Sequence, residues 1–320
     1  MITGAGGFIG SHLAESCVQL GYRVRAFVHY NSGGTWGWLD NSPLKDSMEI
    51  VSGDIRDADS VRNAMKGARS VFHLAALIGI PYSYVSPLAY LRTNIEGAYN
   101  ILEAARDFQL DRVIVTSTSE TYGTAQSVPI GESHPAVGQS PYAATKIGAD
   151  QLALSYHRSF GLPVWVVRPF NTYGPRQSAR AFIPSTAMQL LAGEQLLRVG
   201  NLAPTRDLTF VEDTAAGFLA IAGAESLMGS ATNVGMGSEI SMEALLWKIA
   251  EMLNTKPRIE IDACRVRPES SEVERLYCDN SRLLAQTGWR PRYTLDTGLE
   301  RTLAWLRENM GSHRPAHYSY

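Results

Sequence analysis

The sequence is poor in cysteine, in net charge and in long apolar runs. Its three cysteines, Cys17, Cys264 and Cys278, are odd in number and far apart, which argues against a disulfide framework and against a metal site. A formal net charge of −2 gives no overall basic field that would attract nucleic acid or anionic lipid. No apolar run reaches the length of a membrane span, and no basic segment followed by an apolar one opens the chain. We therefore expect a cytoplasmic protein that binds neither nucleic acid nor a membrane.

The sequence does have enough apolar residues for a full core, with 45% hydrophobic residues and 28 glycines among 320. Up to about Arg168, short apolar runs alternate with amphipathic stretches. This alternation predicts an α/β fold with a doubly wound parallel sheet, the Rossmann arrangement. The predicted buried strands are 22–28, 70–75, 112–117 and 163–168, and the predicted helices between them include 94–108 and 142–159.

The pattern becomes looser after about Asn171. Helices are predicted near 181–193, 212–224, 241–253 and 295–309, separated by loops rich in glycine, proline and arginine. We therefore expect residues 1–170 to form the first domain. Residues 171–320 should form mainly a smaller C-terminal lobe, with some segments returning to the first domain. The tail at 311–320 is expected to be a frayed end.

Three glycines, Gly4, Gly7 and Gly10, stand at G-x-x-G-x-x-G spacing where a helix is predicted to begin near Phe8 and Ile9. Glycines allow backbone N–H groups to approach a pyrophosphate at a helix N-terminus. A plain turn would also use glycine, but the strand at 22–28 favours a dinucleotide site. Only three residues precede Gly4, so either the first strand is short or the natural chain begins earlier.

The choice between NAD and NADP stays open at the sequence level. The end of the second strand, where NAD binding usually places a carboxylate, has His29, and no arginine follows to hold a 2′-phosphate. Asp54 is a candidate for the adenine amino group, although a solvated loop carboxylate would look the same. His73 is predicted to be a core residue. The remaining predicted dinucleotide contacts are Phe8, Ile9, His29, Ile55, Leu74, Ala75, Ala76, Tyr142 and Lys146.

Tyr142 and Lys146 are four residues apart in "SPYAATKIGAD", which places both side chains on one face of a helix. An ammonium beside a phenol favours the phenolate, so we expect the pKa of Tyr142 to fall from about 10 toward neutrality. Tyr142 is therefore a candidate base for a sugar hydroxyl.

T-G-x-x-G-x-x-G at 3–10, the Ser/Thr segment at 117–118 and Y-x-x-x-K at 142–146 together resemble the extended short-chain dehydrogenase/reductases over nearly the whole chain. The resemblance implies a bound NAD or NADP and a nucleotide-sugar substrate whose C4 hydroxyl lies among Tyr142, Lys146 and Thr118. The segments 170–176 and 205–213 are similar to the family's diphosphate-binding segments. The implied diphosphate ligands are Asn171, Arg206 and Arg267.

The segment "TSTSETYG" at 116–123 carries Glu120, which in this resemblance decides the reaction that follows C4 oxidation. A 4,6-dehydratase needs a base for the C5 proton, and a carboxylate can serve. Ser119 stands where dTDP-glucose dehydratases have an aspartate, and we expect Ser119, Glu120 or a water to help the C6 hydroxyl leave. The pattern Thr-Ser-Glu resembles both GDP-mannose dehydratases and UDP-glucuronate decarboxylases. A surface carboxylate is the structural alternative for Glu120.

Three longer segments, 29–40, 170–184 and 202–214, look like the 4,6-dehydratases of legionaminic acid pathways, which implies UDP- or GDP-N-acetylglucosamine as the substrate. The competing interpretations are a UDP-glucuronate decarboxylase, a nucleotide-sugar 4-epimerase, and a non-catalytic protein that senses a dinucleotide. The resemblance also implies a homodimer built on helices 94–108 and 142–159. The apolar residues that favour it, or that belong instead to the chain's own core, are Ile95, Ala98, Ile101, Leu102, Ile147, Leu152 and Leu154.

Overall fold

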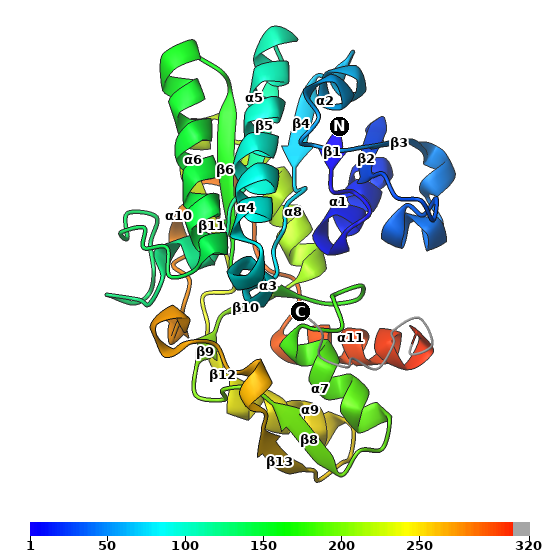
Figure 1. Cartoon of the computed structure of the whole chain (residues 1–320), viewed down its shortest axis with the longest axis vertical. Coiled ribbons are helices and arrows are strands. Elements are labelled where there is room, and N and C mark those ends of the chain that lie inside the picture. The colour runs from blue at the N-terminus through cyan, green and yellow to red at the C-terminus, as the bar shows by residue number, and fades with distance from the viewer. Residues whose placement is uncertain (310–320) are drawn as a thin grey trace.

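The computed structural model describes residues 1–309, so the prediction for the tail at 311–320 lies outside the described residues. Its centre is a seven-stranded, wholly parallel sheet in the order β11-β6-β5-β4-β1-β2-β3 (Figure 1). The strands are β1 (Ile2–Thr3), β2 (Val24–His29), β3 (Met48–Gly53), β4 (Ser70–His73), β5 (Arg112–Thr116), β6 (Val164–Pro169) and β11 (Ala231–Val234).

The strand predictions at 22–28, 70–75, 112–117 and 163–168 are confirmed as β2, β4, β5 and β6, each within two residues at its ends. All six residues of β6 are buried, as expected of a strand covered on both faces. The strand order runs one way from β1 and the other way from β4. Because the order reverses there, the carboxyl ends of β1 and β4 open a crevice in which such folds bind ligands.

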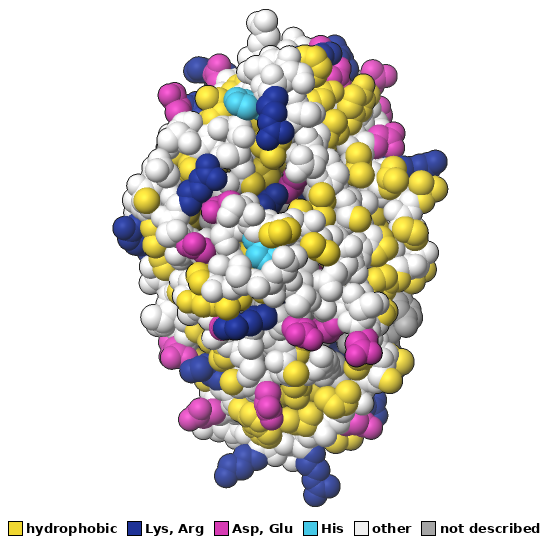
Figure 2. Space-filling model, turned by 90° about the vertical axis from the view of Figure 1, so that its left-hand side faces the viewer, with side chains coloured by type: hydrophobic (Ala, Val, Ile, Leu, Met, Phe, Trp, Pro, Cys, Tyr) yellow, Lys and Arg dark blue, Asp and Glu magenta, His cyan; other side chains and the backbone are white. Residues whose placement is uncertain are grey.

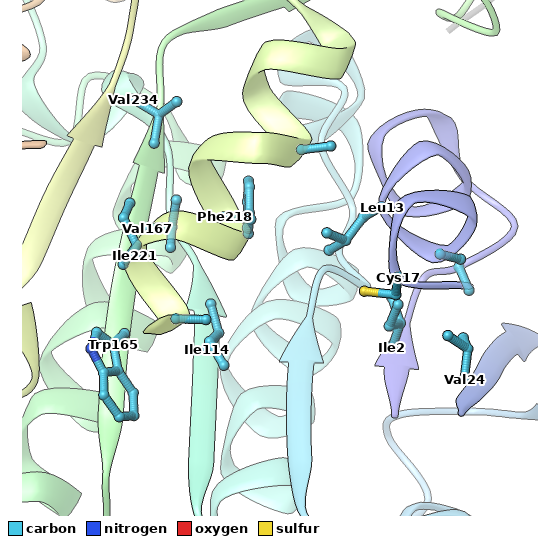
Figure 3. Close-up of a cluster of buried hydrophobic side chains, with 14 of the residues drawn as sticks. Ile2, Leu13, Cys17, Val24, Ile114, Trp165, Val167, Phe218, Ile221 and Val234 are labelled. Atoms are coloured by element: carbon cyan, nitrogen blue, oxygen red, sulfur yellow. The ribbon is translucent and has the colours of Figure 1, made fainter. Parts of the chain in front are cut away.

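Helices cover both faces of the sheet (Figure 1). On one face, α1 (Phe8–Gln19) and α8 (Val211–Gly223) pack together over the strands, and α10 (Ser281–Thr287) lies beside α8. Figure 3 shows Leu13 of α1 and Phe218 of α8 within the same apolar cluster as Ile114 and Val167 of the sheet. The other face is covered by α2 (Ala58–Met65), α5 (Gly97–Asp107) and α6 (Pro141–Phe160). The doubly wound architecture is therefore confirmed.

The remaining elements form a smaller lobe with its own apolar core at the carboxyl edge of the sheet. Because β11, α8 and α10 pack with the parallel sheet and its covering helices, the chain crosses between the sheet and the lobe several times. The elements of the lobe are β7 (Asn171–Tyr173), α7 (Phe182–Leu191), β8 (Leu196–Val199), β9 (Thr205–Arg206), β10 (Leu208–Phe210), β12 (Ile240–Ser241), α9 (Met242–Met252), β13 (Arg258–Ile261), β14 (Arg275–Leu276) and α11 (Leu295–Asn309).

The predicted helix at 94–108 is partly wrong at its start. The chain forms α3 (Ile80–Val85) and α4 (Pro87–Tyr90), then a π-helical turn at Leu91–Glu96, and only then α5. The Asn94 side chain bonds both the N–H and the carbonyl of Leu77, at 2.9 and 3.0 Å, and so holds the turn to the loop after β4. Within residues 1–309, no helix is long and apolar enough to cross a bilayer.

Four of the apolar residues considered for a dimer lie in the chain's own core. Ala98, Ile101, Leu102 and Leu154 are all buried, and the last three belong to the apolar cluster that α5 and α6 share with the strands of the sheet. For these residues the intramolecular alternative is the correct one, because they are already buried within the single chain.

The turn between β1 and α1 generates a prediction about stability. A Cβ on Gly10 would lie 2.2 Å from the Gly4 carbonyl oxygen, which is backbone and cannot move aside alone. Gly10→Ala should therefore lower the free energy of unfolding by about 1–3 kcal/mol. Gly223→Ala, at the end of α8 with nothing within 4 Å of the new Cβ, should be neutral or stabilising. Urea denaturation measures both, and equal values for the two variants would contradict the prediction.

Candidate active site

The glycine turn forms a cradle that fits a pyrophosphate. Gly4 has φ +68°, and a Cβ there would lie 2.8 Å from the Ala75 nitrogen. The backbone N–H groups of Leu74 and Ala75 both bond to the Thr3 hydroxyl at 3.1 Å, which fixes the loop after β4 against this turn. No side chain caps the N-terminus of α1, so its first-turn N–H groups face the crevice without a side-chain acceptor. These features fit a dinucleotide phosphate at a helix N-terminus.

The predicted contacts for the adenosine half are placed at the ends of β2 and β3. His29 is exposed at the end of β2, and the Asn31 side chain after it bonds to its own loop at Thr35. Asp54 is held by Arg56, whose side-chain hydrogen bond lowers the pKa of that carboxyl. Asp54 is thus engaged by a cation, and its predicted role toward adenine stays a prediction.

His73 is confirmed as a core residue. It is 4% exposed, and its Nδ1 lies 2.9 Å from the Thr3 hydroxyl oxygen. Because that hydroxyl already accepts two backbone N–H groups, its own proton is the one shared with His73. Burial lowers the pKa of His73 to about 3, so the ring is neutral across the physiological range.

Tyr142, Lys146 and Thr118 come together at the carboxyl edge of the sheet. The Tyr142 hydroxyl is hydrogen-bonded to Thr118, whose own Oγ1 accepts the Glu120 N–H at 3.3 Å. Lys146 Nζ donates to the Thr116 carbonyl at the end of β5. Tyr142 and Lys146 are 7% and 5% exposed. The segment that follows β5 is therefore attached directly to α6.

The expected lowering of the Tyr142 pKa is wrong for the free chain. Burial is the main effect and raises the pKa of Tyr142, the Thr118 hydrogen bond opposes it, and the Glu120 charge adds to the rise. Burial also lowers the pKa of Lys146 to about 8, although Asp150 acts in the opposite direction. The sequence argument omitted the cost of keeping a phenolate and an ammonium away from water.

Glu120 is a buried carboxylate, not a surface one, with 9% exposure in the short helix at Ser119–Tyr122. Its Oε1 lies 3.8 Å from an Arg267 nitrogen of the C-terminal lobe. Ser119 is also buried, beside it. Glu120 therefore lies at the junction between the carboxyl edge of the sheet and the lobe, between Tyr142 and Arg267.

The two predicted diphosphate arginines are brought together. Arg206 is 7% exposed and lies 3.4 Å from Glu272, which is also 3.7 Å from Arg267. An Arg267 nitrogen and the Asn171 side-chain oxygen are buried without a hydrogen-bond partner among the described residues. Buried polar atoms of this kind fit a site that a polar ligand completes.

The sequence analysis missed three charged residues at this site: the partly buried Glu272 and the buried Asp150 and Arg168. The position of Asp150, four residues after Lys146, was a usable signal because it continues the helix face of Tyr142 and Lys146. Glu272 and Arg168 gave no local signal, since their partners are distant in the sequence.

The chain matches the family model described as GDP-mannose 4,6 dehydratase over residues 1–302. A dTDP-glucose 4,6-dehydratase of Actinoplanes sp. is 31% identical over 316 residues, which cover 97% of this chain and 98% of that relative. A trifunctional UDP-glucose 4,6-dehydratase of Arabidopsis thaliana is 30% identical over 317 residues, which cover 97% of this chain and only 47% of that longer protein.

A solved structure shows the same architecture. The dTDP-glucose 4,6-dehydratase of Streptomyces venezuelae, crystallised with NAD bound, superposes with a TM-score of 0.88 at 30% identity and with 98% of each chain covered. Since the family model spans nearly all of the described residues and the fold agrees, this chain belongs to the GDP-mannose 4,6 dehydratase family, within the extended short-chain dehydrogenase/reductases.

Proposed function

We propose that this enzyme is an NAD(P)-dependent nucleotide-sugar 4,6-dehydratase that converts UDP- or GDP-N-acetylglucosamine to the 4-keto-6-deoxy sugar. The observation that carries the proposal is the buried Glu120 carboxylate, which lies between the Tyr142 site and Arg267 of the lobe. The choice of base and sugar rests on the resemblance of the loop at 29–40 and of the two lobe segments, 170–184 and 202–214.

The first step oxidises C4. Tyr142 takes the O4 proton, with Thr118 hydrogen-bonded to the phenol oxygen and Lys146 one helical turn further along α6. When bound, NAD(P) would supply the acceptor for the C4 hydride and the source of the hydride that returns to C6. Asn171, Arg206 and Arg267 hold the diphosphate, which fixes the sugar relative to Tyr142.

The second step eliminates water across C5 and C6. The C4 ketone makes the C5 proton acidic, and Glu120 removes it while the C6 hydroxyl leaves as water with a proton from Ser119, Glu120 or a water molecule. Hydride return to C6 and a proton from solvent to C5 would then give the 4-keto-6-deoxy product. The substrate loses one water, and the dinucleotide ends in the oxidation state in which it began.

Product masses separate this function from its rivals. Incubation with a panel of UDP-, GDP- and dTDP-hexoses should give loss of one water from UDP- or GDP-N-acetylglucosamine. Loss of carbon dioxide from a uronate would instead identify a decarboxylase, and interconversion of two hexosamines without loss of water would identify a 4-epimerase. Tight dinucleotide binding with no turnover of any nucleotide sugar would favour the sensing protein.

Glu120→Gln should separate the two steps. The amide keeps the shape of the side chain but cannot accept the C5 proton, so overall turnover should fall by a factor on the order of 10² to 10⁴. Reduced dinucleotide should accumulate, and its absorbance measures this accumulation. Solvent deuterium should no longer enter C5. Tyr142→Phe should block even the reduction of the dinucleotide. Near wild-type dehydration by Glu120→Gln would refute the role of this carboxylate.

The pH profile should report the pair of Tyr142 and Lys146. The pKa of Lys146 is about 8 and that of Tyr142 is higher, so the pair as a whole loses its first proton near pH 8. The state with phenolate and ammonium has lost one proton, so kcat/KM should rise with pH and level off above about 8. In Lys146→Met the plateau should disappear, and kcat/KM should continue to rise at higher pH. A wild-type profile that is flat from pH 6 to 9 would contradict this assignment.

A homodimer is the second part of the proposal. Leu88, Leu91, Ile95 and Tyr99 follow at three- and four-residue spacing along α4, the π-helical turn and α5, and all but Ile95 are about half exposed. Figure 2 shows that apolar side chains also gather on the face that it presents, among charges of both signs. A stripe of exposed apolar residues along a helix fits the same stripe of a second copy related by a two-fold axis.

Sedimentation tests the dimer directly. The wild-type enzyme should sediment as a dimer at micromolar concentration, and Leu91→Asp should give a monomer because a charge on this stripe would be buried without a partner. Leu20→Asp is the matched control, since Leu20 is exposed at the end of α1, away from the stripe. A monomeric wild-type enzyme would exclude the dimer.

A further inference from the structure

Three side chains on one face of α6 hold the end of β5 and the turn that follows it. Tyr142, Lys146 and Asp150 are spaced by four residues, so they lie one turn apart. The first two bond to residues 118 and 116, as described above. Asp150 Oδ2 accepts the Ser117 hydroxyl at 2.6 Å. Each of the three consecutive residues 116–118 is thus attached to a different turn of the same helix.

Asp150 also reaches the far end of this segment through Arg168 of β6. Arg168 donates to Asp150 Oδ2 at 3.0 and 3.1 Å, and another of its nitrogens donates to the Tyr122 hydroxyl at 3.1 Å. The two charged side chains are 1% and 8% exposed. The pair therefore spans the segment from Ser117 to Tyr122, and Glu120 lies between these two anchors.

We propose, on the basis of the proposed function, that Asp150 is a positioning residue that fixes segment 117–122 against α6, so that Thr118 and Glu120 face the same sugar that Tyr142 deprotonates. A buried ion pair is weak support for stability, because desolvation of both charges offsets their attraction. The contacts of this pair with both ends of segment 117–122 explain its presence better than a contribution to stability does.

The second oxygen of Asp150 gives an independent reason to assign this residue a positioning role rather than a stabilising one. Asp150 Oδ1 is buried and has no hydrogen-bond partner among the described residues, an arrangement that costs stability. Lys146 interacts with Asp150 on its own helix and with the neutral His73 on β4, and Tyr142 lies one helical turn before it. Asp150 is the anion among them and raises the pKa of Lys146 against burial. It therefore also helps to keep Lys146 charged.

Asp150→Asn tests the charge at nearly constant shape. Loss of the carboxylate should move the acid limb of kcat/KM to lower pH by about one unit, since a unit charge one helical turn away has an effect of this size. Lysine NMR should show the same fall in the pKa of Lys146, its signal assigned with Lys146→Met. This titration needs no substrate, so it tests the inference even if the proposed reaction is wrong.

Ser117→Ala tests the attachment while the charge is kept. Removing this hydroxyl frees one end of the segment, so turnover should fall by about 10- to 100-fold with KM changed less than about threefold. The acid limb and the Lys146 titration should stay at their wild-type values. The two variants thus separate positioning from charge.

Asp213→Asn is the control for loss of any buried carboxylate. Asp213 is fully buried and accepts the backbone N–H groups of Arg292 and Tyr293, away from Lys146. Asp213→Asn should lower the free energy of unfolding without moving the acid limb of kcat/KM or the NMR titration of Lys146. Wild-type titration of Lys146 in Asp150→Asn, or wild-type turnover in Ser117→Ala, would overturn the inference.

Discussion

The attachment of α6 to the end of β5 is the constraint on which the active site depends. In the C-terminal half of α6 the contact is apolar, with Ala153 and Leu154 in the same core cluster as Val113 and Val115 of β5. Toward the carboxyl edge of the sheet it becomes polar and charged, through Lys146 and Asp150. The helix is therefore anchored by apolar packing at one end, and at the other end it can hold buried charges in fixed positions. Such charges have strong effects because little water screens them.

The reacting groups and the substrate-binding groups of the proposed reaction come from different parts of the chain. The groups for oxidation lie on α6 and after β5, whereas the arginines that would hold the substrate come from the lobe. The loop after β7 ties the parts together, because Arg176 pairs with Glu15 of α1 at 2.9 Å and the Pro175 carbonyl lies 3.1 Å from a His12 nitrogen. These contacts fix α1 relative to the lobe.

Local patterns were sufficient for most elements of the first domain. Continuous apolar runs predicted β2, β4, β5 and β6, because a strand covered on both faces needs such runs. The glycine spacing and the pair Tyr142 and Lys146 could also be identified, since each depends on backbone geometry within a few residues. The π-helical turn at 91–96 was missed because Asn94 is held by a loop that lies distant in the sequence.

The sequence by itself determined the α/β architecture, the glycine cradle and the shared face of Tyr142 and Lys146, because these follow from periodicity and steric limits that act locally. Only the tertiary structure decided the burial of Glu120, its approach to Arg267, and the pairing of Asp150 with Arg168. It also decided that the pKa of Tyr142 rises in the free chain. The physical reason is that burial and charge pairing depend on which distant segments exclude water from a side chain, and local spacing contains no information about that.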